Sequence, residues 1–244
     1  MTDDFRLIEF DTVESTMTEA AILAAGGQFD DWTTVIARHQ TGGRGRSGRS
    51  WASQPGDALL ATVIARVALP PERVGVIAIA AGVAIAEALG NVGVEVGLKW
   101  PNDLIANDRK LGGILIQTLM GTPLTALIGI GVNLRKVPLQ VSAEAVSIAD
   151  LVQTSPSPVD AARLVVPQLR ASIAAIEQGR GERIIARWSA LALWLGERVS
   201  VIADRKVEGI LQGIDEFGRL CIRTKTGIER LTQGEVRRGP RKLD

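Results

Sequence analysis

Three arginines stand among glycines in the segment TGGRGRSGRSW, residues 41–51, and they are the densest group of side chains able to do chemistry. They are Arg44, Arg46 and Arg49, and no acidic residue occurs between positions 32 and 56. Guanidinium groups suit bidentate capture of carboxylate or phosphate, and glycine lets the backbone approach a ligand closely. We therefore predict an anion-binding loop that stays mobile until a ligand orders it, with a solvated basic turn as the alternative.

The same loop matches two nucleotide-binding patterns, and its context excludes both. Gly43, Gly45 and Gly48 fit the dinucleotide fingerprint, and residues 43–50 nearly fit the phosphate-binding P-loop. Each pattern requires a helix directly after the glycines, because the helix N-terminus holds the phosphates. Residues 51–57 read WASQPGD, with a Pro-Gly turn where that helix would begin.

A second group of polar side chains lies in KWPNDLIANDRKLGGILI, residues 99–116. Asn102 and Asp103 stand where a strand is expected to open into a turn, so Asp103 is either a turn cap or a ligand for Mg²⁺ beside phosphate oxygens. Lys110 enters the next predicted strand just before two glycines, within reach of a ligand on the backbone. The segment GIGVNL, residues 129–134, ends at Asn133, and its glycines favour a ligand lying flat across the sheet.

Strands and helices must position these groups. From Gly196 onward the sequence consists of short β segments separated by turns, and this change in pattern suggests two domains. Five short β segments in the last part of the chain predict a small barrel of SH3 size. We place the boundary after residue 195. Apolar and β-branched runs before it predict strands at 33–40, 58–66, 94–100, 114–120 and 124–134, and helices at 70–90, 159–178 and 182–194.

Composition limits the class of protein. The 244 residues are 46% apolar and 23% charged with a net charge of +1, so no overall field favours nucleic acid, and Arg237, Arg238, Arg241 and Lys242 are predicted to form a solvated tail. One cysteine and one histidine exclude an internal disulfide and argue against a His-based metal site. The longest uncharged run, residues 74–86, is shorter than a membrane span and predicts a buried helix. We expect a cytoplasmic protein without a membrane anchor.

The segments GRGRSGRSW, KWPNDL, RKLGGIL and GIGVNL, in this order and spacing, closely resemble the biotin–protein ligases, and DTVESTMTEA is similar to a segment near the start of that family's catalytic core. The resemblance covers nearly the whole chain. It implies an α+β fold, with a mixed-sheet catalytic domain in residues 1–195 and an SH3-like β-barrel in residues 196–244. It also implies that biotin and MgATP form biotinyl-5′-AMP, whose biotin then passes to one lysine of a biotin carboxyl carrier protein. A DNA-binding repressor domain is not expected, because the core begins within the first ten residues.

The resemblance also assigns roles to individual positions. Lys110 and Arg46 are the implied catalytic residues, and Asp103 is an implied Mg²⁺ ligand. Met17 stands where the family usually has Asn. The implied contacts to biotin or its adenylate are Ser15, Thr16, Met17, Gln40, Gly43, Arg44, Gly45, Arg46, Lys110, Gly113, Gly129 and Gly131, and those to ATP are Arg46, Arg49, Asn102, Asp103, Lys110 and Asn133.

Physical chemistry is consistent with this reaction. A carboxylate and a triphosphate repel each other, and fixed cations such as Arg46 and Lys110 offset that repulsion. The reactive adenylate must be kept from water, which is a task for a glycine-hinged loop acting as a lid. Two alternatives stay open: a lipoate–protein ligase, although that family's RRxSGGGxVxHD-like segment is absent, and a non-catalytic protein that senses biotin. A homodimer is compatible with the resemblance.

Overall fold

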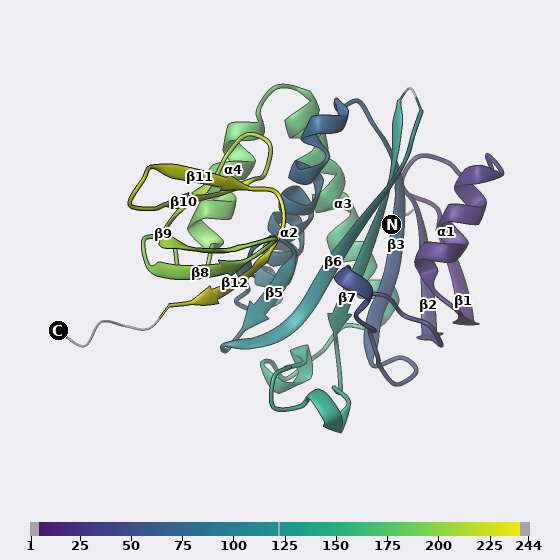
Figure 1. Ribbon diagram of the computed structural model, residues 1–244. Helices are drawn as coiled ribbons and strands as arrows, with labels where there is room; N and C mark the ends of the chain where they lie inside the picture. Colours follow the sequence, from purple (N-terminus) through teal and green to yellow (C-terminus); the bar gives the residue numbers. More distant parts are fainter. Residues whose placement is uncertain (1–4, 122, 240–244) are drawn as a thin grey trace.

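A seven-stranded mixed sheet forms the larger part of the molecule (Figure 1). The computed structural model describes residues 5–121 and 123–239, except for the side chain of Ser47. The strand order is β1-β2-β3-β7-β6-β5-β4; β1 pairs with β2 in parallel and the other neighbours are antiparallel. The strands are β1 (Leu7–Val13), β2 (Thr33–Gln40), β3 (Ala58–Val67), β4 (Gly97–Lys99), β5 (Asp103–Ala106), β6 (Arg109–Leu119) and β7 (Leu124–Asn133).

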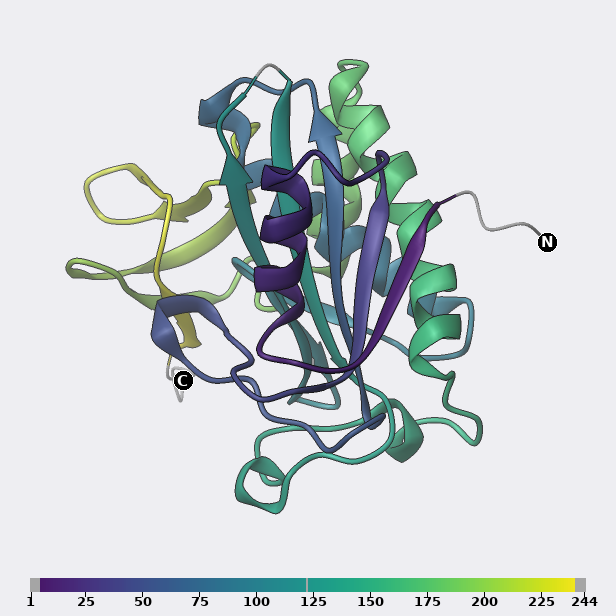
Figure 2. The ribbon, with the colours of Figure 1, turned by 90° about the vertical axis from the view of Figure 1, so that its right-hand side faces the viewer.

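Helices cover both faces of this sheet. Helix α1 (Thr16–Ala25) packs on one face, and α2 (Gly75–Gly90) and α3 (Pro158–Glu177) pack on the other, with α4 (Gly181–Leu191) beside them (Figures 1 and 2). Alternate residues of one strand therefore enter different cores, as in β2, where Val35 packs with α1 and Ile36 with the larger cluster. The α+β class and the mixed sheet predicted from the sequence are confirmed.

Helix α2 is the core helix expected from the long uncharged run. Together with the 3₁₀ turn Pro71–Arg73 it is the one described segment whose length and apolar composition suit a membrane span. Twelve of the sixteen residues of α2 are buried inside the protein, where it packs against α3, α4 and the sheet.

The C-terminal strands form a five-stranded antiparallel sheet and not the closed barrel that we predicted. Its order is β11-β10-β9-β8-β12, so β11 and β12 are the two edges. Apolar side chains such as Val201 and Leu211 join the same core cluster as α2 and α4, and the sheet buries its inner face there instead of closing on itself. The strands are β8 (Arg198–Ile202), β9 (Lys206–Ile214), β10 (Leu220–Arg223), β11 (Ile228–Leu231) and β12 (Glu235–Arg238).

The predicted solvated tail is wrong for its first two arginines. Arg237 and Arg238 belong to β12, and Arg238 Nε lies 2.6 Å from a carboxylate oxygen of Glu197. Arg241 and Lys242 lie outside the described residues. The division of the chain after residue 195 stays a prediction.

Candidate active site

A pocket of about 460 Å³ opens on the sheet face where β3, β6 and β7 carry small residues, and it gathers most of the predicted site residues. The start of α1, the arginine loop, the turn before β5 and the edge of β12 complete its wall. The predicted residues that line it are Ser15, Thr16, Met17, Gln40, Arg44, Gly45, Arg46, Arg49, Asn102, Asp103, Lys110, Gly113, Gly129 and Gly131. Gly43 and Asn133 are not among the lining residues.

The first turn of α1 supplies a buried polar wall. Ser15 is the helix N-cap, and its hydroxyl accepts a hydrogen bond from the Met17 amide at 3.2 Å. The Thr16 amide and hydroxyl both donate to Gln40 Oε1, at 2.7 and 3.0 Å, and the Thr16 and Thr62 hydroxyls lie 2.9 Å apart. These bonds fix Gln40 at the end of β2, so the wall is preorganised to recognise a polar group.

The floor of the pocket is backbone. A Cβ on Gly131 would lie 3.0 Å from the Trp51 ring, and one on Gly129 would lie 2.7 Å from Met17 Cε. The two large side chains therefore lie directly on the glycines of β7 and cover this part of the floor. The Trp51 indole nitrogen is buried and has no hydrogen-bond partner among the described residues, which leaves one donor for a ligand. Trp51 follows the arginine loop directly, but its contribution to the pocket was not predicted.

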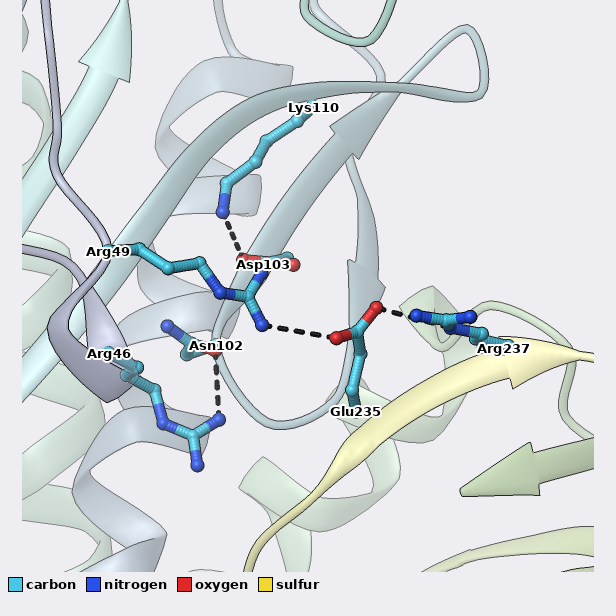
Figure 3. Close-up of polar contacts among 7 residues, drawn as sticks. All are labelled: Arg46, Arg49, Asn102, Asp103, Lys110, Glu235 and Arg237. Carbon is cyan, nitrogen blue, oxygen red and sulfur yellow. Dashed lines mark hydrogen bonds and ion pairs between the residues drawn. The ribbon is translucent and has the colours of Figure 1, made fainter. Parts of the chain in front are cut away.

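An ion pair lies at the other end of the pocket. Lys110 Nζ is 2.6 Å from Asp103 Oδ1, across the β5–β6 hairpin, and the two side chains are partly buried (Figure 3). The Lys110 amide donates to the Glu144 carbonyl at 2.8 Å. Asn133 lies behind this strand and donates to the Lys110 and Val146 carbonyls at 3.4 and 3.1 Å. Asn133 therefore holds the backbone that presents Lys110.

Arg46 reaches into the pocket from the short 3₁₀ turn Arg46–Gly48. Its Nη1 donates to Asn102 Oδ1 at 3.4 Å, and Asn102 Nδ2 donates to the Ile114 carbonyl at 2.7 Å (Figure 3). Burial lowers the pKa of Arg46, the charge of Asp103 opposes this shift, and the charge of Arg49 adds to it. Arg46 is thus a partly desolvated cation, which favours binding of an anion.

Two other loop arginines have carboxylate partners from distant parts of the chain. Arg44 Nη2 lies 2.7 Å from Glu14 Oε1, and Arg49 Nη2 lies 3.1 Å from Glu235 Oε2 (Figure 3). Both arginine side chains are more than half exposed, so this part of the loop is a basic surface turn that is neutralised by ion pairs. Gly43 closes the loop: its carbonyl accepts from the Trp51 amide at 2.9 Å, and a Cβ would lie 2.5 Å from the Trp51 oxygen. That the loop orders over a ligand stays a prediction.

The C-terminal sheet also contributes to this pocket, which no sequence motif had indicated. Glu235 carries the contact to Arg49 and is also bonded to Arg237, with Arg237 Nε 3.3 Å from Oε1. Burial raises the pKa of Glu235, but the charges of Arg237, Arg49 and Lys99 outweigh it and leave the pKa below its ordinary value. The lining residues from this sheet and its turns are Ile202, Ala203, Gln233, Gly234, Glu235 and Val236.

Metal-binding groups are sparse at the site. Within the described parts of the chain, no three His, Cys, Asp or Glu side chains are grouped so that they could hold a metal ion. Asp103 is the carboxylate beside Lys110, with the Asn102 amide next to it. One carboxylate is enough for Mg²⁺ only when phosphate oxygens and water complete its octahedron.

Comparison with known proteins agrees with this architecture. Residues 9–133 match the model of the biotin/lipoate A/B protein ligase family, and residues 194–239 match that of the biotin protein ligase C-terminal domain. The biotin–[acetyl-CoA-carboxylase] ligase of Mycobacterium tuberculosis is 36% identical over 85% of this chain and 79% of its own length. The bifunctional ligase/repressor BirA of Escherichia coli is 30% identical over 90% of this chain and 70% of its own.

A solved structure extends the similarity to the fold. The biotin protein ligase from Aquifex aeolicus in complex with biotin and ATP superimposes with a TM-score of 0.83, at 26% identity, over 96% of this chain and 99% of that one. The match therefore includes both sheets. The chain belongs to the biotin/lipoate A/B protein ligase family and, within it, to the biotin–protein ligases.

Proposed function

We propose that this protein activates biotin with MgATP to biotinyl-5′-AMP and transfers the biotin to one lysine of a biotin carboxyl carrier protein. The observation that carries the proposal is the make-up of the pocket. An apolar, glycine-floored half lies beside Met17 and Trp51, and a cationic half lies beside Lys110 and Arg46. Biotin has an apolar ring and chain that end in a carboxylate, so the two halves suit its two ends.

The polar wall suits the ring of biotin. The Thr16–Gln40 cluster ends the apolar floor, and a ureido group needs fixed donors and acceptors at that position. A ring that binds on Gly129 and Gly131 displaces the Met17 and Trp51 side chains from these glycines. The carboxylate then extends toward Lys110.

The cationic end suits the first chemical step. A carboxylate oxygen of biotin attacks the α-phosphorus of ATP, the new C–O–P link forms, and the bond to pyrophosphate breaks. Negative charge gathers on the α-phosphoryl oxygens, where Lys110 and Arg46 offset it. Lys110 lies 2.6 Å from Asp103, so anions that bind here compete with this carboxylate for Lys110.

The second step needs an acceptor amine. The unprotonated lysine nitrogen of the carrier attacks the carbonyl carbon of the mixed anhydride, an amide bond forms, and AMP leaves with the former carboxylate oxygen. The arginine loop, tied to Glu14 and Glu235, covers the pocket and excludes water from the anhydride.

Mg²⁺, the compartment and the assembly belong to the proposal as well. Asp103 and Asn102 would hold Mg²⁺ together with ATP phosphates, and the ion would supply additional positive charge at the transferring group. We place the reaction in the cytoplasm. The present contacts favour no particular oligomeric state.

One experiment tests the proposal directly. The protein is incubated with biotin, MgATP and a biotin carboxyl carrier domain, pyrophosphate is measured, and the intact mass of the domain is recorded. We expect pyrophosphate release and a gain of one biotinyl group, lost when the acceptor lysine is replaced by arginine. Lipoate in place of biotin should support neither. Equal reaction with lipoate would favour a lipoate–protein ligase, and biotin binding without pyrophosphate release would favour a non-catalytic sensor.

A further inference from the structure

A second cleft, of about 610 Å³, adjoins the candidate active site. It lies between the N-terminal part of α2 and the turn that joins β9 to β10, over the middle of β6. The two cavities meet, because they share six lining residues. These are Arg46, Trp100, Pro101, Asn102, Ile114 and Leu115.

The outer wall of this cleft is fixed in place by close contacts. The Trp100 indole nitrogen donates to the Gly218 carbonyl at 3.0 Å in a buried position. A Cβ on Gly75 would lie 2.8 Å from the Phe217 oxygen, and one on Gly218 would lie 3.0 Å from the backbone of Gly75. The turn therefore rests directly on α2, and this contact fixes the outer wall of the cleft.

Internal bonds make the same turn rigid. One carboxylate oxygen of Asp215 accepts from the amides of Phe217 and Arg219 at 3.0 Å each, and the other lies 2.7 Å from Arg219 Nε. The guanidinium of Arg219 lies over the Phe217 ring, 4.9 Å from its centroid. The positive charge of Arg219 is therefore already balanced within the turn.

The remaining lining is mostly apolar, and its polar side chains are those of Thr232 and Glu72. Ala78, Ile79 and Ile116 line the groove, and Glu72 stands exposed at its edge with no ion pair among the described residues. A polyphosphate is repelled by such a carboxylate. A polypeptide segment with a lysine is attracted, since the carboxylate pairs with its charge and the apolar surface with its aliphatic stem.

We propose that this cleft receives the lysine-bearing segment of the acceptor protein. The inference rests on the proposed function. Biotin and nucleotide fill the first pocket beneath the arginine loop, so the acceptor amine needs a separate entrance to the anhydride. The second cleft provides it. Arg46 and Asn102 line both cavities, and the 3.4 Å hydrogen bond between them closes the junction (Figure 3), so this bond has to open for the acceptor lysine to pass.

Separate assays of the two half-reactions test this route. Glu72→Arg reverses the charge at the edge, and Ala78→Arg narrows the groove; neither position lines the first pocket. We expect both variants to release pyrophosphate from biotin and MgATP at the wild-type rate without acceptor. The KM for the carrier domain should rise about tenfold or more, in Glu72→Arg because a like charge replaces an opposite one and in Ala78→Arg because the larger side chain occupies the groove. Reaction of the adenylate with hydroxylamine, which needs no groove, should not change.

Glu182→Arg is the matched control. Like Glu72, Glu182 is an exposed acid in the first turn of a helix, but it lies outside both cavities. It should leave the KM for the carrier unchanged. Wild-type KM values in both cleft variants, or an equal rise in Glu182→Arg, would overturn the assignment. If the wild-type protein releases no pyrophosphate, the proposed function itself fails, and the cleft assignment fails with it.

Discussion

The ion pair between Arg49 and Glu235 connects the arginine loop to the edge strand of the C-terminal sheet. The two side chains are 65% and 37% exposed, and their N–O distance is 3.1 Å. Exposed pairs of this kind contribute about 0.2–1 kcal/mol, because water and salt screen them. We predict that Glu235→Gln lowers the free energy of unfolding by no more than about 1 kcal/mol.

The Arg49–Glu235 pair affects ATP binding more than stability if it positions the arginine loop. A change of about 1 kcal/mol alters the ratio of two loop positions about fivefold. Because Arg49 is proposed to contact ATP, Glu235→Gln should raise the KM for ATP about two- to fivefold and leave kcat nearly unchanged. Pyrophosphate release at varied ATP and saturating biotin measures both constants.

A double-mutant cycle separates positioning from a direct role of Glu235. Arg49→Ala removes both the loop contact and the proposed phosphate contact, so its own effect should be larger. If Glu235 acts only through Arg49, Glu235→Gln has no further effect in the Arg49→Ala background. An equal rise in the KM for ATP in both backgrounds, which means a coupling free energy near zero, would refute the reasoning.

Acidity and salt should change this coupling in predictable directions. Although burial raises the pKa of Glu235, the nearby arginines and Lys99 hold it below its ordinary value, so the carboxylate is more acidic folded than unfolded. Its contribution is therefore complete above the ordinary glutamate pKa of about 4.3 and is lost as the pH falls through the lowered folded value. Between pH 6 and 8 the coupling should stay constant. At an ionic strength of about 1 M, where the screening length is about 3 Å, it should weaken.

Three further substitutions test other parts of the site. Lys110→Ala should reduce pyrophosphate release at least about 100-fold, because it removes a fixed cation at the transferring phosphoryl group; near-normal release would exclude Lys110 from the mechanism. Gly112→Ala places a Cβ 2.6 Å from the Gly131 carbonyl oxygen and should cost about 1–3 kcal/mol in urea unfolding, whereas an unchanged midpoint would show that the strands separate easily. Trp100→Phe leaves the buried Gly218 carbonyl unpaired and should cost about 1–3 kcal/mol by the same measurement, unless water replaces the indole.

Local patterns predicted β2, β3 and β7 and missed β1, β5 and α1. β2 and β3 lie in the interior of the sheet, and their β-branched and apolar runs give nearly continuous burial. β1 is the edge strand, only one of its seven residues is buried, and its sequence LIEFDTV includes two acids. An edge strand has one hydrogen-bonding partner and a wet face, so its apolar pattern is weak.

The closed barrel was predicted wrongly for a related reason. Five short strands with turns between them indicate a small β domain, but not whether its inner face closes on itself or packs elsewhere. In this protein Val199 and Ile222 belong to the cluster that contains α2 and α4. The inner face of the sheet packs against the apolar surface of these helices instead of closing into a barrel. The pattern of a single sequence does not show which surface will cover such a face.

In the candidate site, too, the contacts between residues close in sequence could be predicted and those between distant residues could not. Asp103 and Lys110 are seven residues apart across a hairpin whose turn residues Asn107 and Asp108 both have positive φ, so their proximity follows from local sequence. The partners of the arginine loop do not, since Glu14 and Glu235 are 30 and 186 residues from Arg44 and Arg49. The loop itself contains no acidic residue, but in the folded protein carboxylates from other segments pair with its arginines.

The position of the C-terminal sheet connects these findings. Its edge strand supplies Glu235 to the first pocket, and its β9–β10 turn supplies one wall of the second cleft. Trp100, at the end of β4, is hydrogen-bonded to that turn and lines both cavities. Because the sheet shares its core with α2 and α4, a shift of the sheet would alter the loop contact and the cleft together. Retention of the adenylate and entry of the acceptor lysine would then both depend on how the C-terminal sheet packs against α2 and α4. Separate assays of the two half-reactions are needed to distinguish the two effects.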